Sequence, residues 1–440
     1  MKNKKWMAIL LGGIMAASLA APCSVSAAEK TTLTFWHAMG GTNGEVLQQI
    51  VDDFNASQDE IEIKAEYQGT YDDTITKLKA AMQSDSGLPD VCQMYDVGTK
   101  FMYDSGAVIP VEDKFESTGY DKSSVMDVIS SYYTVEGKQY AMPFNVSTPM
   151  LYYNKDVFEA AGLDPETPPT TYDEVLEDAK KIVESGAAPV GYSQAIYGWF
   201  FEQQLAGLGV TYGNNDNGRT EAVTAVDFDS NGGGLKVFDM WKKLYDSGYF
   251  EDYGTTTADT QTAFFSGQVG MIIESTAILK NAVDSSPFEV GTGYLPRIEQ
   301  NDEGGVIIGG GSLWLTDTGN EANEDAAWKF IEYITTPDVQ AKWSMGTGYF
   351  AINEKAYETD DMKAYLKENP NFETAINQLK DSPVNCNTAG VLSGVQTEAR
   401  LTFNEIMPQV YDGKLTTQDA VDQLAASVNK AIENYNESIK

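Results

Sequence analysis

Cysteine and histidine are both scarce in this sequence of 440 residues. The three cysteines are Cys23, Cys92 and Cys386, and the one histidine is His37. A single histidine excludes a metal site built on several histidines and a catalytic triad that uses any other histidine. We therefore expect no metal ion and no cofactor. Cys92 and Cys386 lie far apart in the sequence, so the sequence leaves open whether they form a disulfide or remain two separate thiols.

Positive charge is scarce as well. The chain has 30 lysines and arginines against 65 aspartates and glutamates, a formal net charge of −35. Such a surface repels DNA and anionic lipid, so neither a nucleic-acid partner nor binding to an anionic membrane surface is expected. If the ligand is an anion, its site must be a local exception to this field.

Long apolar runs are limited to the N-terminus, where one extends from Met7 to about Ala21. Lysines precede this run, and the small-residue pattern VSA at 25–27 follows it, which is the layout of a secretory signal peptide. We expect a signal peptide over 1–27 and an exported protein, periplasmic or associated with the cell surface. A lipid anchor at Cys23 is the less favoured alternative, because Pro22 fits the lipobox poorly.

The remaining residues, 28–440, are too many for one core of ordinary size, so two domains are expected. Apolar alternation predicts strands that are separated by amphipathic helices, an order that implies parallel sheets flanked by helices. The expected strands include 32–37, 61–67, 90–95 and 270–274, and 150–163 should be a strand entering a helix. Capping-box spacing at Thr42 and Glu45, and again at Thr171 and Glu174, predicts two helix starts.

The stretch VIIGGGSLWL (306–315) places three glycines inside what otherwise resembles a buried strand. Glycine in a strand marks a bulge, a bend or a close approach by a ligand. The run matches neither the Walker pattern nor the dinucleotide fingerprint. The stretch alone leaves a backbone bend and a ligand contact as alternatives.

Five motifs together resemble the family 1 extracellular solute-binding proteins of ABC importers, and among them the glycerol-3-phosphate binders of the Ugp uptake system. They are FWHAMGG (35–41), YQGTYDD (67–73), the long stretch 143–169, IIGGGSLW (307–314) and TGYFAIN (347–353). The resemblance implies an α/β, two-lobed periplasmic-binding-protein-like fold. Each lobe would be a mostly parallel sheet flanked by helices, with the ligand cleft between the lobes. The lobes would comprise 28–145 plus 277–315 and 146–276 plus 316–440.

The resemblance also implies a ligand-binding set, a membrane ABC permease as partner, a monomer and no enzymatic activity. The implied set is Tyr71, Asp96, Ser147, Ser275, Gly310, Tyr349 and Arg400. Arg400 would bind phosphate oxygens, for which its planar fork of donors is suited. Asp96 stands where the family has glutamate and would accept hydrogen bonds from glycerol hydroxyls. A side chain at Gly310, as in Gly310→Val, should abolish ligand binding and leave the fold largely intact.

Ile196 departs from the family pattern, because it stands where the glycerol-phosphate binders have a tryptophan against the ligand. Space beside the ligand would suit a glycerophosphodiester such as glycerophosphocholine as well as glycerol-3-phosphate, and Tyr197 or Trp199 would face the choline cation. A sugar or oligosaccharide binder is the alternative within the family. A secreted glycosidase with two carboxylates is a third reading, although no carboxylate lies in a recognisable catalytic motif.

Overall fold

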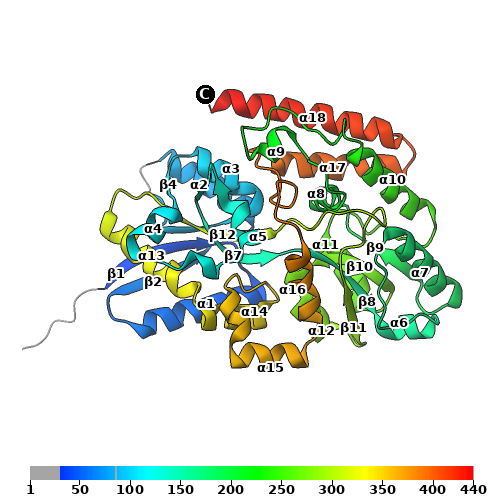
Figure 1. The fold of residues 1–440 in the computed structure, drawn as a ribbon, viewed down its shortest axis with the longest axis horizontal. Coiled ribbons are helices and arrows are strands. Elements are labelled where there is room, and N and C mark those ends of the chain that lie inside the picture. Colours follow the sequence, from blue (N-terminus) through cyan, green and yellow to red (C-terminus); the bar gives the residue numbers. More distant parts are fainter. Residues whose placement is uncertain (1–29, 85–86, 440) are drawn as a thin grey trace, which may run out of the picture.

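The computed structural model describes residues 30–84 and 87–439, which form two α/β lobes side by side (Figure 1). The expected signal peptide and Cys23 lie outside the described residues. Among the described residues, no helix combines the length and the apolar content that crossing a bilayer would require. The two-lobed α/β class expected from the sequence is confirmed.

The first lobe is built on a six-stranded sheet of order β2-β1-β3-β12-β4, with β7 paired to β12. Its strands are β1 (Thr31–His37), β2 (Ile61–Tyr67), β3 (Val91–Tyr95), β4 (Val108–Ile109), β7 (Met142–Ser147) and β12 (Gly309–Thr316). β1 runs parallel to β2 and β3, whereas β12 runs antiparallel to β3, β4 and β7.

The second lobe is built on a four-stranded sheet of order β11-β8-β10-β9. Its strands are β8 (Pro149–Asn154), β9 (Val190–Ser193), β10 (Val269–Ser275) and β11 (Val290–Gly293). β10 is parallel to β9, but β8 is antiparallel to both β10 and β11. Both sheets are therefore mixed and not mostly parallel, because strands such as β12 re-enter a sheet from the other lobe and run in the opposite direction.

Helices cover both sheets and join the lobes. The first sheet is covered by α1 (Gly41–Ser57), α2 (Tyr71–Met82), α13 (Glu321–Ile334) and α14 (Pro337–Thr347). The second lobe carries α7 (Tyr172–Ser185), α8 (Gly198–Gly207), α10 (Gly233–Asp246), α17 (Gln396–Tyr411) and α18 (Thr417–Ser438). Further helices are α11 (Thr257–Phe265), α12 (Leu279–Ser285), α15 (Asp360–Glu368) and α16 (Asn371–Asp381). Shorter elements are α3 (Thr99–Asp104), α4 (Val111–Thr118), α5 (Asp127–Ser130), α6 (Lys155–Ala160), α9 (Asn214–Gly218), β5 (Thr134–Val135) and β6 (Lys138–Gln139).

The division of the chain between the lobes differs from the expected one in two places. β11 lies within the range 277–315 expected for the first lobe, but it pairs with β8 in the second sheet. α13 and α14 lie within 316–440, expected for the second lobe, but they pack on β1, β12 and α1 of the first. Strand pairing decides the first assignment and helix packing the second, and the local sequence pattern contains neither.

One expected helix start is confirmed and the other is wrong. Thr171 and Glu174 form a reciprocal capping box at the start of α7. At α1 the N-cap is Gly40, with no side-chain hydrogen bond, so Thr42 and Glu45 do not form the box that their spacing predicts. Spacing shows that two groups are within reach, but the backbone entering the helix decides which residue takes the capping position.

Two large apolar clusters, with a small third one around Ala351 and Met362, stabilise the part of the chain that the structure describes. The first surrounds the sheet of the first lobe and continues onto one face of the second sheet through residues such as Tyr152 and Ile272. The second lies between the other face of the second sheet and helices α7, α8, α10, α17 and α18, with Leu424 and Val428 fully or almost fully buried. Because the first cluster crosses between the lobes, the lobes share part of their core.

Candidate ligand-binding site

The glycine run lies on β12, between β3 and β7, where the first sheet faces the second lobe. Gly310 has φ of +93°, and a Cβ atom there would lie 1.9 Å from the carbonyl oxygen of Asn145. The register with β7 shifts directly after Gly311. Glycine is therefore required by the backbone itself. The expectation that a side chain at Gly310 would leave the fold intact is wrong, because it would collide with β7.

Tyr71 is positioned by a capping box immediately before it, in which Thr70 and Asp73 bond to each other's backbone. Its hydroxyl accepts a hydrogen bond of 2.7 Å from Nδ2 of Asn145, and its ring stacks on Tyr95 with the centroids 5.1 Å apart. Burial raises the pKa of Tyr71 well above its usual value, so the residue remains a neutral phenol that can donate a hydrogen bond.

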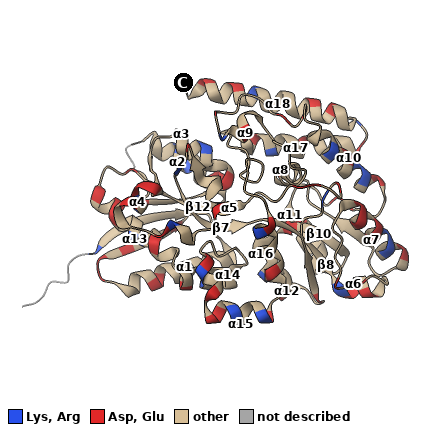
Figure 2. Ribbon diagram, viewed as in Figure 1, with Lys and Arg blue, Asp and Glu red and all other residues tan. Residues whose placement is uncertain are grey.

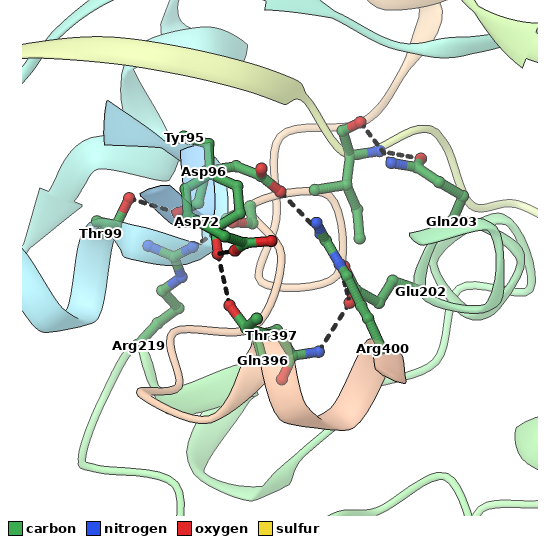
Figure 3. A network of polar contacts seen from close by, with 12 residues as sticks. Asp72, Tyr95, Asp96, Thr99, Glu202, Gln203, Arg219, Gln396, Thr397 and Arg400 are labelled. Carbon is green, nitrogen blue, oxygen red and sulfur yellow. Dashed lines mark hydrogen bonds and ion pairs between the residues drawn. The ribbon is translucent and has the colours of Figure 1, made fainter. Parts of the chain in front are cut away.

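Arg400 lies at the centre of a buried ion-pair network (Figure 3). Its Nε and Nη2 donate to the two carboxylate oxygens of Glu202 at 2.8 and 2.7 Å. Nη2 also donates to Oδ2 of Asp96 at 2.8 Å. Gln396 donates to Oε1 of Glu202 at 2.9 Å. Asp96, which the sequence assigned to ligand hydroxyls, thus has one oxygen on Arg400.

Glu202 was missed by the sequence analysis. It lies in GWFFEQQLAG, the sequence of α8, and nine of those ten residues are buried. A charged residue within a helix that is buried on nearly all sides is the signal that was available, since a buried charge needs a partner. The partner lies on α17, far along the chain, and the sequence does not show that the two helices are in contact.

The charges of the network sum to −1, from two carboxylates and one guanidinium. Burial alone would lower the pKa of Arg400, but Asp96 and Glu202 outweigh it and hold the pKa well above its usual value. Burial raises the pKa of Glu202, and the charge of Arg400 opposes that shift. Arg400 is therefore permanently charged and already compensated by the protein.

The network crosses from one lobe to the other. Asp96 begins the short 3-10 helix Asp96–Gly98 after β3 in the first lobe, whereas Arg400 and Glu202 lie on α17 and α8 of the second. A second link lies nearby, a 2.6 Å hydrogen bond between the hydroxyls of Tyr95 and Thr397. These contacts place the predicted site between the lobes.

The other predicted residues surround the same region. Ser147 ends β7 and pairs with Gly309. Ser275 ends β10, opposite Pro149, and its side chain accepts a hydrogen bond from the backbone of Ala277, as expected where a helix begins. Tyr349 is buried, with its ring stacked on Trp343 at 5.6 Å. The structure thus brings the predicted set to one region, and that these residues bind a ligand remains a prediction.

The two predicted wall residues differ in their surroundings. Ile196 has no exposed surface and packs within the second apolar cluster, so the free space expected there is filled. The ring of Trp199 lies against Gly309, where an added Cβ atom would be 2.7 Å from the indole. Nε1 of Trp199 is buried and has no hydrogen-bond partner among the described residues.

A cavity of about 530 Å³ lies elsewhere, beside the 294–306 loop and α16. Its polar groups largely satisfy one another: Tyr294 donates to Asp381 at 2.7 Å, and Gln378 accepts from the backbone of Leu295 at 2.5 Å. None of the predicted ligand-binding residues lines this cavity, so it is separate from the region around Arg400. Cys92 and Cys386 are both free thiols, and the described residues contain no cluster suited to a metal ion.

Two α/β lobes joined by several chain crossings, with buried polar side chains from both meeting between them, define a two-lobed solute-binding protein. The chain belongs to the family of bacterial extracellular solute-binding proteins, whose model matches residues 49–374. Members of this family bind a small solute outside the cytoplasmic membrane for an ABC importer and are not enzymes, which removes the glycosidase reading.

The relatives include the sn-glycerol-3-phosphate-binding periplasmic protein UgpB of Escherichia coli K12, 31% identical over 417 residues, which covers 93% of this chain and 94% of that protein. Similar structures include UgpB from Mycobacterium tuberculosis in complex with glycerophosphocholine, with a TM-score of 0.79, 20% identity and coverage of 92% and 99%. Another is the cyclic α-maltosyl-1,6-maltose binding protein from Arthrobacter globiformis, with a TM-score of 0.75, 26% identity and coverage of 92% and 100%.

Proposed function

We propose that this protein captures a glycerophosphodiester such as glycerophosphocholine between its lobes, acting as an exported monomer that presents the ligand to a membrane ABC permease. The observation that carries the proposal is the pairing of Arg400 with both Asp96 and Glu202. A phosphodiester brings one negative charge, whereas a phosphate monoester near neutral pH brings almost two. The compensated arginine therefore favours the diester over glycerol-3-phosphate.

A zwitterionic diester suits the site in a second way. Its quaternary ammonium would enter a region with a net charge of −1 and several aromatic rings. The ring of Tyr197 already lies 5.9 Å from the guanidinium carbon of Arg400, and Trp199 lies nearby with a free indole N–H. Aromatic faces attract cations of this kind. The phosphate oxygens would take donors from Nη1 of Arg400, which forms none of the hydrogen bonds recorded within residues 30–84 and 87–439.

A neutral sugar is the second candidate, and the same compensated arginine favours it. A sugar needs no net positive charge, and the stacked rings of Tyr71 and Tyr95 with the amide of Asn145 resemble a sugar-binding wall. The structural similarity to the Arthrobacter globiformis protein is compatible with this candidate. The 31% identity to a glycerol-3-phosphate-binding protein over nearly the whole chain is the reason for placing the diester first.

Calorimetric titration with glycerophosphocholine, glycerol-3-phosphate and a maltodextrin series tests the proposal. We expect glycerophosphocholine to bind at least tenfold more tightly than glycerol-3-phosphate. Tighter binding of glycerol-3-phosphate would contradict the charge argument, and binding of a maltodextrin alone would establish the second candidate.

A further inference from the structure

We infer that Glu202 is a charge-selecting residue, which holds Arg400 so that the site accepts ligands with at most one negative charge. The inference rests on the proposed function, because it takes the region around Arg400 as the ligand site. Glu202 is outside the residues that the sequence resemblance implied. Its role follows from its contacts with Arg400 and Gln396.

Of the two carboxylates that pair with Arg400, one lies in the same lobe as Arg400 and the other lies in the opposite lobe. Glu202 and Arg400 belong to adjacent helices of the second lobe, so their pair does not depend on how the lobes are arranged. Asp96 comes from the first lobe and reaches Nη2 only while the lobes are together (Figure 3). Glu202 is thus the constant counter-ion, and Asp96 joins it on closure.

With Glu202 already paired to Arg400, the buried network holds one carboxylate more than neutrality requires. Asp96 brings this second carboxylate in the arrangement seen here. A second buried carboxylate adds an uncompensated negative charge, which costs free energy in a medium of low dielectric constant. A ligand with a positive group lowers that cost, and a ligand with a second negative charge increases it.

The geometry also limits how an anion can reach the arginine. Glu202 occupies the Nε and Nη2 edge of the guanidinium, the edge that would otherwise bind a phosphate with two parallel hydrogen bonds. Only Nη1 remains, because the two hydrogens of Nη2 go to Glu202 and Asp96. A phosphate group is therefore bound through fewer charge-assisted hydrogen bonds than a free arginine would provide.

The test compares wild-type protein with Glu202→Gln, which keeps the size of the side chain and removes its charge. The matched control is Glu398→Gln, an exposed residue of the same helix as Arg400. The ligands are glycerol-3-phosphate, its methyl diester and glycerophosphocholine, titrated by calorimetry at pH 8. We expect Glu202→Gln to bind glycerol-3-phosphate at least tenfold more tightly than wild type and Glu398→Gln to match wild type.

A second experiment with the same variants does not depend on the proposed ligand. Inorganic sulfate is a dianion, and we expect it to raise the melting temperature of Glu202→Gln and to leave that of wild type unchanged. If wild type binds no phosphodiester but the variant gains sulfate binding, the proposed ligand fails and the inference stands. If wild type binds glycerophosphocholine but the variant gains neither sulfate nor glycerol-3-phosphate, the inference is overturned and the function stands.

Two further measurements keep the inference testable if Glu202→Gln folds poorly. Glu202→Asp retains the charge, so it should retain the wild-type preference for the methyl diester over glycerol-3-phosphate. The wild-type comparison of these two ligands needs no variant at all. Equal or tighter binding of the doubly charged monoester by wild type would overturn the inference.

Discussion

At Arg400, one side chain serves both the fold and the predicted recognition of the ligand. Its buried guanidinium holds two carboxylates that come from different lobes. A buried ion pair contributes little net stability when both partners are present, because desolvation offsets the attraction. Removing one partner is different, because the other charges then remain buried and unpaired.

Arg400→Ala should therefore lose both stability and binding. Leaving Asp96 and Glu202 unpaired is expected to lower the free energy of unfolding by about 3–5 kcal/mol, measured by denaturant unfolding. Loss of the charge partner should weaken ligand binding by about 2–5 kcal/mol, measured by calorimetry. A stable variant with less than a threefold loss of affinity would show that Arg400 neither supports the fold nor contacts the ligand.

Gly310 is a second position where one residue determines local structure. Gly310→Ala should lower the free energy of unfolding by more than the roughly 1–2 kcal/mol that a left-handed backbone costs an ordinary residue, since its Cβ would also meet the carbonyl of Asn145. Denaturant unfolding measures this change. Gly413→Ala, which has a similar positive φ and open space around it, is the matched control and should show only the conformational cost. Equal losses for the two variants would contradict the role of the close contact.

At the scale of elements, β10 carries a buried carboxylate with no cationic partner among its recorded contacts. Glu274 accepts hydrogen bonds from Gln261 at 2.9 Å and from the backbone of Ser275 at 2.6 Å. Burial raises its pKa from 4.5 to about 7, against these two hydrogen bonds. The residue precedes Ser275 of the predicted ligand set, so its protonation changes a charge next to the site.

The raised pKa predicts how stability depends on pH. Between pH 4.5 and 7 the native state binds the proton of Glu274 more tightly than the unfolded state, so this group makes the free energy of unfolding fall as pH rises. The fall should amount to about 3 kcal/mol and be complete above pH 7, since one pKa unit corresponds to about 1.4 kcal/mol.

Glu274→Gln should abolish this contribution. Denaturant unfolding of wild type and variant from pH 4 to 8 gives the difference in stability, from which contributions common to both proteins cancel. We expect the variant to gain stability relative to wild type as pH rises through this range. A difference that does not change with pH would show that Glu274 is ionised at the same pH in both states.

At the scale of the whole molecule, contacts outside the predicted site also hold the lobes together. The end of α18 lies beside α3 of the first lobe (Figure 1). There the hydroxyl of Tyr435 donates to Asp104 at 2.6 Å. Acidic residues are spread over the helices of both lobes (Figure 2). Closure therefore brings negative surfaces together, and specific interlobe hydrogen bonds offset part of that repulsion.

Tyr435→Phe should weaken ligand binding without contacting the ligand. Loss of a hydrogen bond to a charged carboxylate costs about 1.5–3 kcal/mol, which is roughly ten- to 150-fold in affinity. Titration measures the affinity, and small-angle scattering should show a larger radius of gyration for the free variant. Tyr249→Phe is the matched control, because its hydroxyl bonds to Glu184 within the second lobe. Equal effects of the two changes would contradict the interlobe role of Tyr435.

The linear sequence was enough to predict the two-lobed α/β class, the main strands and several of the residues that meet between the lobes, but not Glu202. Local periodicity and motifs that resemble a known family indicate these features, and both can be recognised in the sequence without knowledge of the fold. The start of α7 was predicted correctly because Thr171 and Glu174 are three residues apart and bond to each other. The start of α1 was not predicted correctly, because the backbone between β1 and α1 makes Gly40 the N-cap residue in place of Thr42.

The features that depend on contacts between distant residues can be read only from the folded molecule. The partners of Arg400 lie 198 and 304 positions away in the chain, so no spacing rule relates them. The assignment of β11 to the second sheet follows from hydrogen bonds to β8, and the requirement for glycine at position 310 follows from the carbonyl of Asn145. The physical reason is the same in each case: packing sets which groups become neighbours, and the energy of a charge, a strand edge or a glycine depends on those neighbours.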